Sequence, residues 1–222
     1  MQPTIVFDLD GTLVDTAGDL VAALNHVLAG EDVGPVALAD GVRMVGNGAR
    51  AMLRTALVES GRQPSVQDLD RMTGDFLAWY LDHIAVHSRP FPGATEALDR
   101  FAADGWRLAV CTNKFEKAAR LLLGELGLAD RFAAISGQDT FAAMKPDPLH
   151  LLETVRAAGG SPSRAVMVGD SNVDADTARD ARIPSVLVTF GYSPVPAATL
   201  GADRLIDRYD QLFATAAGLI GS

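Results

Sequence analysis

The sequence predicts an α/β protein with a doubly wound parallel sheet and an all-helical segment inserted after the first strand. Short apolar runs without polar alternation recur along the chain, as in parallel strands that are buried on both faces. Helical patterns separate these runs, which indicates strand–helix–strand units. Between residues 15 and 90 only helical patterns occur. The expected architecture is therefore a Rossmann-like core that carries an all-α cap.

Five apolar runs are predicted to be the strands of the core. They span residues 5–7, 107–111, 132–136, 165–168 and 185–189, and the third is the weakest. Helical patterns over residues 94–103, 116–126, 148–158, 173–181 and 209–219 follow or separate them. Gly127 and Gly159 come directly after two of these patterns, where glycine commonly ends a helix.

Residues 15–90 are predicted to form the cap. Helical patterns span residues 20–28, 49–59 and 66 to about 84, and no strand is expected among them. The core resumes at Phe91-Pro92-Gly93, whose proline and glycine suit a hinge and a helix start. We therefore expect a core of residues 1–14 and 91–222 and a cap of residues 15–90.

Composition excludes several classes of function. The 222 residues, 48% of them hydrophobic, suffice for one core domain with an insert. Nineteen basic against 28 acidic residues give a net charge of −9, which argues against a nucleic-acid or membrane-surface binder. No apolar run is long enough for a membrane span, and the chain does not start with a signal-peptide pattern.

The cysteine, histidine and aromatic residues offer little chemistry. The lone Cys111 allows no disulfide framework, fits a reducing cytoplasm and is expected to be a buried small hydrophobe. The four histidines lack a metal-ligand spacing and are interpreted as surface or helix-packing residues. Trp79 and Tyr80 lie in a helical pattern and are interpreted as part of the cap core.

Polar residues gather at the ends of the predicted strands, and these are the candidate functional residues. They are Asp8, Asp10, Thr112, Asn113, Asp170, Ser171 and Asp174, with Lys145 in a loop before a helix. In an open α/β sheet the carboxyl ends of the strands form the ligand site. Several carboxylates at one place repel one another and need a hard divalent cation, and Mg²⁺ suits carboxylate, water and phosphate oxygens.

This set of residue types suits phosphoryl transfer. An aspartate can attack phosphorus and split hydrolysis into two easier steps, and a carboxylate two residues on can exchange protons with the leaving oxygen. Thr112, backbone N–H groups and Lys145 would hold the phosphoryl oxygens. Taken singly, each residue has a plainer explanation as a turn, a helix cap or a surface lysine. The complete set in chain order makes the functional interpretation stronger.

That set resembles the four motifs of the haloacid-dehalogenase superfamily of phosphohydrolases. The matching segments are Asp8-Leu9-Asp10-Gly11-Thr12, Thr112-Asn113, Lys145-Pro146-Asp147-Pro148 and Gly169-Asp170-Ser171-Asn172-Val173-Asp174. They agree in order and in strand context from end to end of the core. The position of the cap, between the first and second motifs, is similar to the helical-cap branch of the family.

The resemblance implies a role for each matching residue. Asp8 is the expected nucleophile and Asp10 the general acid/base. Asp8, the backbone carbonyl of Asp10 and Asp170 would hold Mg²⁺, with Asp174 acting through water or from behind these ligands. Thr112 and the Asn113 amide would bind phosphate, and Lys145 would offset charge on the phosphate and on Asp8.

A closer resemblance is to the bacterial phosphoglycolate phosphatases, and it implies 2-phosphoglycolate as the substrate. It rests on Val45-Gly46-Asn47-Gly48, Thr112-Asn113-Lys114, the segment around Lys145 and Phe190-Gly191-Tyr192. Gly46, Asn47 and Gly48 would then form a cap loop that closes over a small substrate. We expect Asn47, and either Arg43 or Arg50, to contact the substrate carboxylate. Met144 departs from the basic residue expected before the motif lysine.

Other functions on the same scaffold stay open. A sugar-phosphate phosphatase or a phosphomutase would share the core motifs, because specificity depends on the cap. A phosphate-binding or phospho-acceptor module would share the acidic pocket, but Asp10 and the cap favour turnover. A dehalogenase is disfavoured by Asp10, and a phosphonatase by the lack of lysine in residues 15–90. The expected partner is a small phosphorylated metabolite, bound by a monomer or a dimer.

Overall fold

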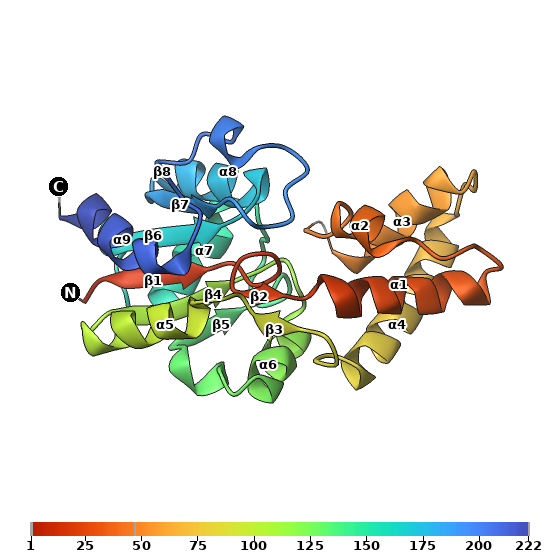
Figure 1. Cartoon of the computed structure of the whole chain (residues 1–222), viewed down its shortest axis with the longest axis horizontal. Helices are drawn as coiled ribbons and strands as arrows, with labels where there is room; N and C mark the ends of the chain where they lie inside the picture. Colours follow the sequence, from red (N-terminus) through yellow and green to blue (C-terminus); the bar gives the residue numbers. More distant parts are fainter. Residues whose placement is uncertain (1, 47, 222) are drawn as a thin grey trace.

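The structure, a computed structural model, describes residues 2–46 and 48–221. A parallel sheet flanked by helices lies at one end of the molecule, and helices α1–α4 gather at the other end (Figure 1). The two chain termini lie near each other on the sheet side, away from α1–α4 (Figure 1). Within the two described ranges, no helix combines the length and the apolar character that crossing a membrane requires.

The core sheet has six strands in the order β5-β4-β1-β6-β7-β8, and every neighbouring pair is parallel. The strands are β1 (Thr4–Phe7), β4 (Arg107–Cys111), β5 (Ala134–Ser136), β6 (Ala165–Gly169), β7 (Ser185–Val188) and β8 (Arg204–Ile206). From β1 the order proceeds outward through β4 to β5, and the chain then returns to the other side of β1 for β6. This arrangement confirms the doubly wound fold and places the end of β1 at the switch point, where such sheets bind ligands.

Helices cover both faces of the sheet, as expected for buried parallel strands. One face carries α5 (Ala94–Ala103), α6 (Glu116–Glu125) and α9 (Leu212–Ile220), and the other α7 (Pro148–Ala157) and α8 (Asn172–Ala181). Ile5 and Phe7 of β1 pack into the first layer and Val6 into the second, and all three are fully buried. Short 3₁₀ helices complete the core: η1 (Ala129–Arg131), η2 (Pro162–Arg164), η3 (Ala197–Thr199) and η4 (Tyr209–Gln211).

Residues 15–90 contain the helices α1 (Ala17–Gly30), α2 (Leu38–Val42), α3 (Ala49–Glu59) and α4 (Val66–Asp82). The expectation that this segment contains no strand is wrong. A two-stranded antiparallel ladder joins β2 (Val14–Asp15) to β3 (Arg89–Pro90) at its two ends. Two-residue strands are too short to show a period in the sequence. The ladder brings the outgoing and returning chain together beside the core.

Two further elements, one in the core and one in residues 15–90, differ from the sequence prediction. The edge strand β8 was not predicted, because two of its three residues are exposed and it lacks the apolar run of a buried strand. The five-residue helix α2 was not predicted either, and only Gly41 is buried within it. Both elements lack the apolar periodicity on which a sequence prediction depends.

Candidate active site

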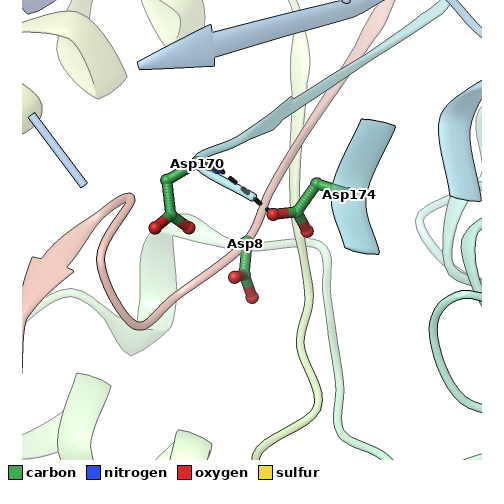
Figure 2. A group of neighbouring side chains, drawn as sticks. All are labelled: Asp8, Asp170 and Asp174. Atoms are coloured by element: carbon green, nitrogen blue, oxygen red, sulfur yellow. Dashed lines mark hydrogen bonds between the residues drawn. The ribbon is translucent and has the colours of Figure 1, made fainter. Parts of the chain in front are cut away.

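Three carboxylates from separate segments meet at the switch point of the sheet (Figure 2). Asp8 follows β1, Asp170 follows β6, and Asp174 lies in the first turn of α8. One oxygen from each lies within 4.8 Å of the others, which is close enough to share one cation. The structure thus brings Asp8 together with Asp170 and Asp174, two predicted site residues that lie far from it in the sequence.

Lys145 is buried among these carboxylates. Its Nζ lies 2.9 Å from Oδ1 of Asp8 and donates to Oδ1 of Asp174 at 2.6 Å. The other oxygen of Asp174 accepts from the Ser171 hydroxyl and from the N–H groups of Asp170 and Ser171; the bond from the Asp170 N–H is dashed in Figure 2. Both oxygens of Asp174 are therefore engaged, and this carboxylate fixes the Lys145 ammonium beside Asp8.

Asp170 is held from two sides. The Thr12 hydroxyl donates to its Oδ1 at 3.1 Å, and the Tyr192 N–H donates to its Oδ2 at 2.7 Å. Thr12 belongs to the motif after β1, and Tyr192 to the loop after β7. These two contacts orient the carboxylate of Asp170 toward the neighbouring Asp8 and Asp174.

The cluster is short of positive charge. Burial raises the pKa of Asp8 to about 6 against the attraction of Lys145. Burial, together with the charges of Asp174 and Asp8, raises the pKa of Asp170 to about 8. In the described part of the chain, the buried Oδ1 of Asp8 accepts no well-formed hydrogen bond, although Lys145 is near. Three ionised carboxylates beside one ammonium have a net negative charge that one divalent cation would neutralise.

Asp10 lies apart from the cluster and has its own partners. The Lys114 ammonium lies 2.9 Å and 3.0 Å from its two carboxylate oxygens, and the Thr16 hydroxyl donates to Oδ1 at 2.7 Å. The Lys114 side chain is only 6% exposed, and its Nζ lies 4.7 Å from the ring centroid of Tyr80 in α4. Burial lowers the pKa of Lys114, but Asp10 and Tyr80 together raise it more, so the ammonium stays charged.

Thr112 and Asn113 follow β4 and lie beside the cluster, as expected. The buried hydroxyl of Thr112 accepts from the Lys114 N–H at 3.2 Å. The side-chain amide of Asn113 donates to the backbone carbonyl of Lys145 at 2.9 Å. Among the residues that the structure places, none hydrogen-bonds the buried Oδ1 of Asn113. Asn113 thus connects the loop after β4 to the loop that carries Lys145.

A cavity of about 60 Å³ opens over these side chains, between the sheet and the helices α1, α3 and α4. Its polar lining includes Asp8, Asp10, Thr112, Asn113, Lys114 and Lys145. The rest is mainly apolar: Leu20, Val45, Ala49, Met52, Phe76, Leu77, Tyr80, Phe115, Ala118 and Val173. One water molecule needs roughly 10–15 Å³ of such space, so the cavity suits a small ligand.

Comparison with known proteins identifies the family. The family model for haloacid dehalogenase-like hydrolases matches residues 5–188, which is most of the chain. The chain belongs to this family. The match begins in β1 and ends with β7, so it includes all the cluster residues.

Relatives within the family carry a consistent name. A phosphoglycolate phosphatase of Mesorhizobium japonicum is 49% identical over 211 residues, which cover 95% of this chain and 93% of that protein. One from Caulobacter vibrioides is 46% identical over 206 residues, which cover 93% and 87%. The crystal structure of a predicted phosphoglycolate phosphatase from Haemophilus somnus superposes with a TM-score of 0.89 at 26% identity and covers 96% of this chain and 97% of that one.

The residues expected in the cap have different outcomes in this haloacid dehalogenase-like chain. Gly46 and Gly48 line the cavity, with φ angles of +113° and +84° that favour glycine. Asn47 lies outside the described residues. Arg43 and Arg50 are exposed and pair with Asp40 and Asp70, and neither lines the cavity. The expectation that one of these arginines contacts the substrate carboxylate is therefore unsupported by the structure.

Four residues of the site had no role in the sequence interpretation. Thr12 and Tyr192 hold Asp170, and Lys114 and Thr16 hold Asp10. All except Thr16 stood within the motif segments on which the family resemblance rests. The partners of those three are far away in the sequence, so their roles become visible only once the chain is folded.

The remaining sequence interpretations concern residues outside the cluster. Cys111 is buried, and burial raises the pKa of its thiol to about 12, so it is no nucleophile. His26 and His83 stack on Trp79, as expected for helix-packing residues. Tyr80 is a core residue, as interpreted, and it also lines the cavity.

Proposed function

We propose that this protein is a magnesium-dependent phosphatase that hydrolyses 2-phosphoglycolate to glycolate and phosphate through an aspartyl-phosphate intermediate. The observation that carries the proposal is the position of Asp8, which lies at the sheet switch point with Lys145 2.9 Å away. A small cavity opens in front of it and is also lined by Asp10. The names of the full-length relatives support the choice of substrate.

Asp8 would act as the nucleophile. Its carboxylate oxygen forms a bond to phosphorus while the bond from phosphorus to the glycolate oxygen breaks. Asp10, which lines the same cavity, would give a proton to the leaving oxygen and then take one from the water that cleaves the aspartyl-phosphate. The Thr16 hydroxyl and Lys114 hold the Asp10 carboxylate in place. Lys145 would offset the charge on the phosphoryl oxygens.

The donor set fits magnesium. Asp8, the backbone carbonyl of Asp10 and Asp170 would hold the ion, and Asp174 would act from behind by fixing Lys145. When bound, the ion neutralises the carboxylates and withdraws charge from the phosphoryl oxygens. The raised pKa values of Asp8 and Asp170 and the unpartnered Asp8 oxygen support the binding of a cation by these residues.

Residues 15–90 would act as a cap over this site. The helices α1, α3 and α4 supply the apolar wall of the cavity, which would keep water from the aspartyl-phosphate. Because the cavity is small, it favours a two-carbon ester over the sugar phosphates that the same scaffold can also serve.

The test is release of phosphate, with Mg²⁺, from 2-phosphoglycolate, glucose 6-phosphate, fructose 6-phosphate and p-nitrophenyl phosphate. We expect kcat/KM for 2-phosphoglycolate to exceed that for either hexose phosphate by about a hundredfold or more, which corresponds to roughly 2.7 kcal/mol. A better rate with a hexose phosphate would overturn the substrate assignment. Absence of phosphate release from every ester would overturn the phosphatase itself.

A further inference from the structure

Lys114 has an unusual position in the cavity. Among the described residues that line it, Lys114 and Lys145 are the cationic side chains. Lys145 lies on the carboxylate cluster, where it faces the phosphoryl group of the proposed reaction. Lys114 instead lies over the ring of Tyr80 in α4, with its ammonium 4.7 Å from the ring centroid. The two cationic side chains that line the cavity therefore have different surroundings.

A buried ammonium in an apolar cavity needs anionic partners. Lys114 has one, Asp10, and the face of the Tyr80 ring attracts it as well. A lysine ammonium carries three donors, so a second carboxylate can bind beside Asp10 without displacing it. Asp10 also has the Thr16 hydroxyl, 2.7 Å away, and does not depend on Lys114 alone.

Tyr80 offers a second donor at the same place. Its side chain is 1% exposed, and its hydroxyl lacks a well-formed hydrogen bond to any part of the chain that the structure describes. A buried hydroxyl without a well-formed hydrogen bond destabilises the fold, and an anion bound beside Lys114 would remove that cost. Burial raises the pKa of Tyr80 to about 12, so the hydroxyl keeps its proton.

We propose that Lys114, assisted by the Tyr80 hydroxyl, binds the carboxylate of the substrate and thereby makes the site select carboxylate-bearing phosphate monoesters. This inference deepens the proposed function and rests on it. It assigns to Lys114 the contact that the sequence had suggested for Arg43 or Arg50, which are exposed and paired elsewhere. Selection follows because an ester without the carboxylate leaves the desolvated ammonium and hydroxyl without this partner.

The experiment compares two substrates of matched size, 2-phosphoglycolate and 2-hydroxyethyl phosphate, in which a CH₂OH group replaces the carboxylate. We expect the wild-type protein to prefer 2-phosphoglycolate by at least a hundredfold in kcat/KM. Lys114→Met keeps the length of the side chain and removes its charge, and it should reduce this ratio to below about tenfold. Tyr80→Phe should reduce the ratio by about three- to tenfold.

Lys117→Met is the matched control, because Lys117 lies three residues away on α6 with its side chain exposed. It should leave the ratio at the wild-type value. If Lys114 served only to hold Asp10, Lys114→Met would slow both substrates equally, and an unchanged ratio overturns the inference. If Lys114→Met fails to fold, the wild-type ratio and the ratio of Tyr80→Phe still test the inference. Equal wild-type kcat/KM values for the two esters would also overturn the inference. Lack of turnover of both esters by the wild type would instead refute the proposed function.

Discussion

The hydroxyl of Tyr192 donates a hydrogen bond to Oδ1 of Asp15 at 2.5 Å and so joins the loop after β7 to strand β2. The same hydroxyl accepts the N–H groups of Thr16 and Ala17 at 2.7 Å and 2.9 Å, where α1 begins. The backbone N–H of Tyr192 donates to Asp170. One residue therefore connects the carboxylate cluster to the first turn of the helical segment.

Tyr192→Phe should lower the free energy of unfolding by about 1–3 kcal/mol, because it removes the acceptor of the Thr16 N–H and leaves the Ala17 N–H only a longer bond to Asp15. Urea denaturation measures this loss. The Mg²⁺ dependence of activity should change little, since the backbone contact to Asp170 stays. Tyr209→Phe is the matched control: it removes one hydroxyl that donates to the Thr12 carbonyl at 2.6 Å, and its cost should be smaller. Equal stability of wild type and Tyr192→Phe would show that the hydrogen bonds of the Tyr192 hydroxyl contribute nothing to folding stability.

Asp8→Asn should reduce kcat to near the uncatalysed background while the protein stays folded. The amide cannot attack phosphorus, but it fits the same space beside Lys145. Phosphate release and circular dichroism measure the two effects. Asp147→Asn is a control at an exposed helix cap, where asparagine still accepts the Leu149 N–H, and it should keep wild-type activity. More than a tenth of the wild-type kcat in Asp8→Asn would reject Asp8 as the nucleophile.

Removal of metal should abolish activity, and Mg²⁺ should restore it. Magnesium should also raise the melting temperature, because it binds the folded cluster and relieves carboxylate repulsion. Asp170→Asn should remove this thermal shift and, at a pH above about 8 where Asp170 is charged, raise the melting temperature of the metal-free protein, since one buried charge is lost. Calcium should inhibit, because it accepts more ligands in a looser geometry. Full activity after exhaustive chelation would contradict the metal site.

His150 should make folding stability depend on pH. Burial, and then the charge of Lys145, lowers the pKa of His150 to about 4, below the ordinary value of 6.5. Between these values the unfolded chain binds a proton that the folded chain does not, so this contribution to stability rises with pH and is complete above about 6.5. Its ceiling is about 3 kcal/mol.

Urea denaturation between pH 4 and 7 compares the wild type with His150→Asn, whose amide oxygen can still accept the Lys145 N–H. Asp8 and Asp170 have the opposite effect. Their pKa values are raised in the folded protein, so their contribution to folding stability decreases as pH rises. The difference between the two proteins therefore isolates His150, and the stability of the wild type relative to His150→Asn should decrease as pH falls. A constant difference across this range would be evidence against a neutral buried His150.

The sequence predicted those parts of the molecule whose signal is local. Strand β1 is a continuous apolar run followed by Asp8, so both the strand and the candidate site residue at its end could be recognised. Strand β8 is mostly exposed and gave no such pattern. Lys114 and Tyr192 act through Asp10 and Asp15, which are 104 and 177 positions away, and no local pattern encodes such pairs. The charge of Arg43 and Arg50 suggested a contact with the substrate carboxylate. Only the folded structure shows that both are exposed and paired with Asp40 and Asp70.

The cavity wall should set the upper size of the substrate. Met52 of α3 is 2% exposed and lines the cavity, whereas Leu57 of the same helix is 3% exposed and is not among the lining residues. The two side chains thus differ in their access to the ligand and hardly in burial. Met52→Ala and Leu57→Ala should each cost about 2–5 kcal/mol of stability, but only Met52→Ala should enlarge the cavity.

The substrate pair that tests this is 2-phosphoglycolate and 2-phospholactate, which has one additional methyl group beside the carboxylate. The wild type should prefer 2-phosphoglycolate by about 10- to 200-fold in kcat/KM, which is what one methyl group is worth in a fitted apolar pocket. Met52→Ala should reduce this preference at least fivefold, because the space vacated by the thioether accepts the methyl group. Leu57→Ala should keep the wild-type preference while losing similar stability. If both variants reduced the preference equally, the effect would come from loosened packing of α3, and Met52 would have no direct part in limiting substrate size.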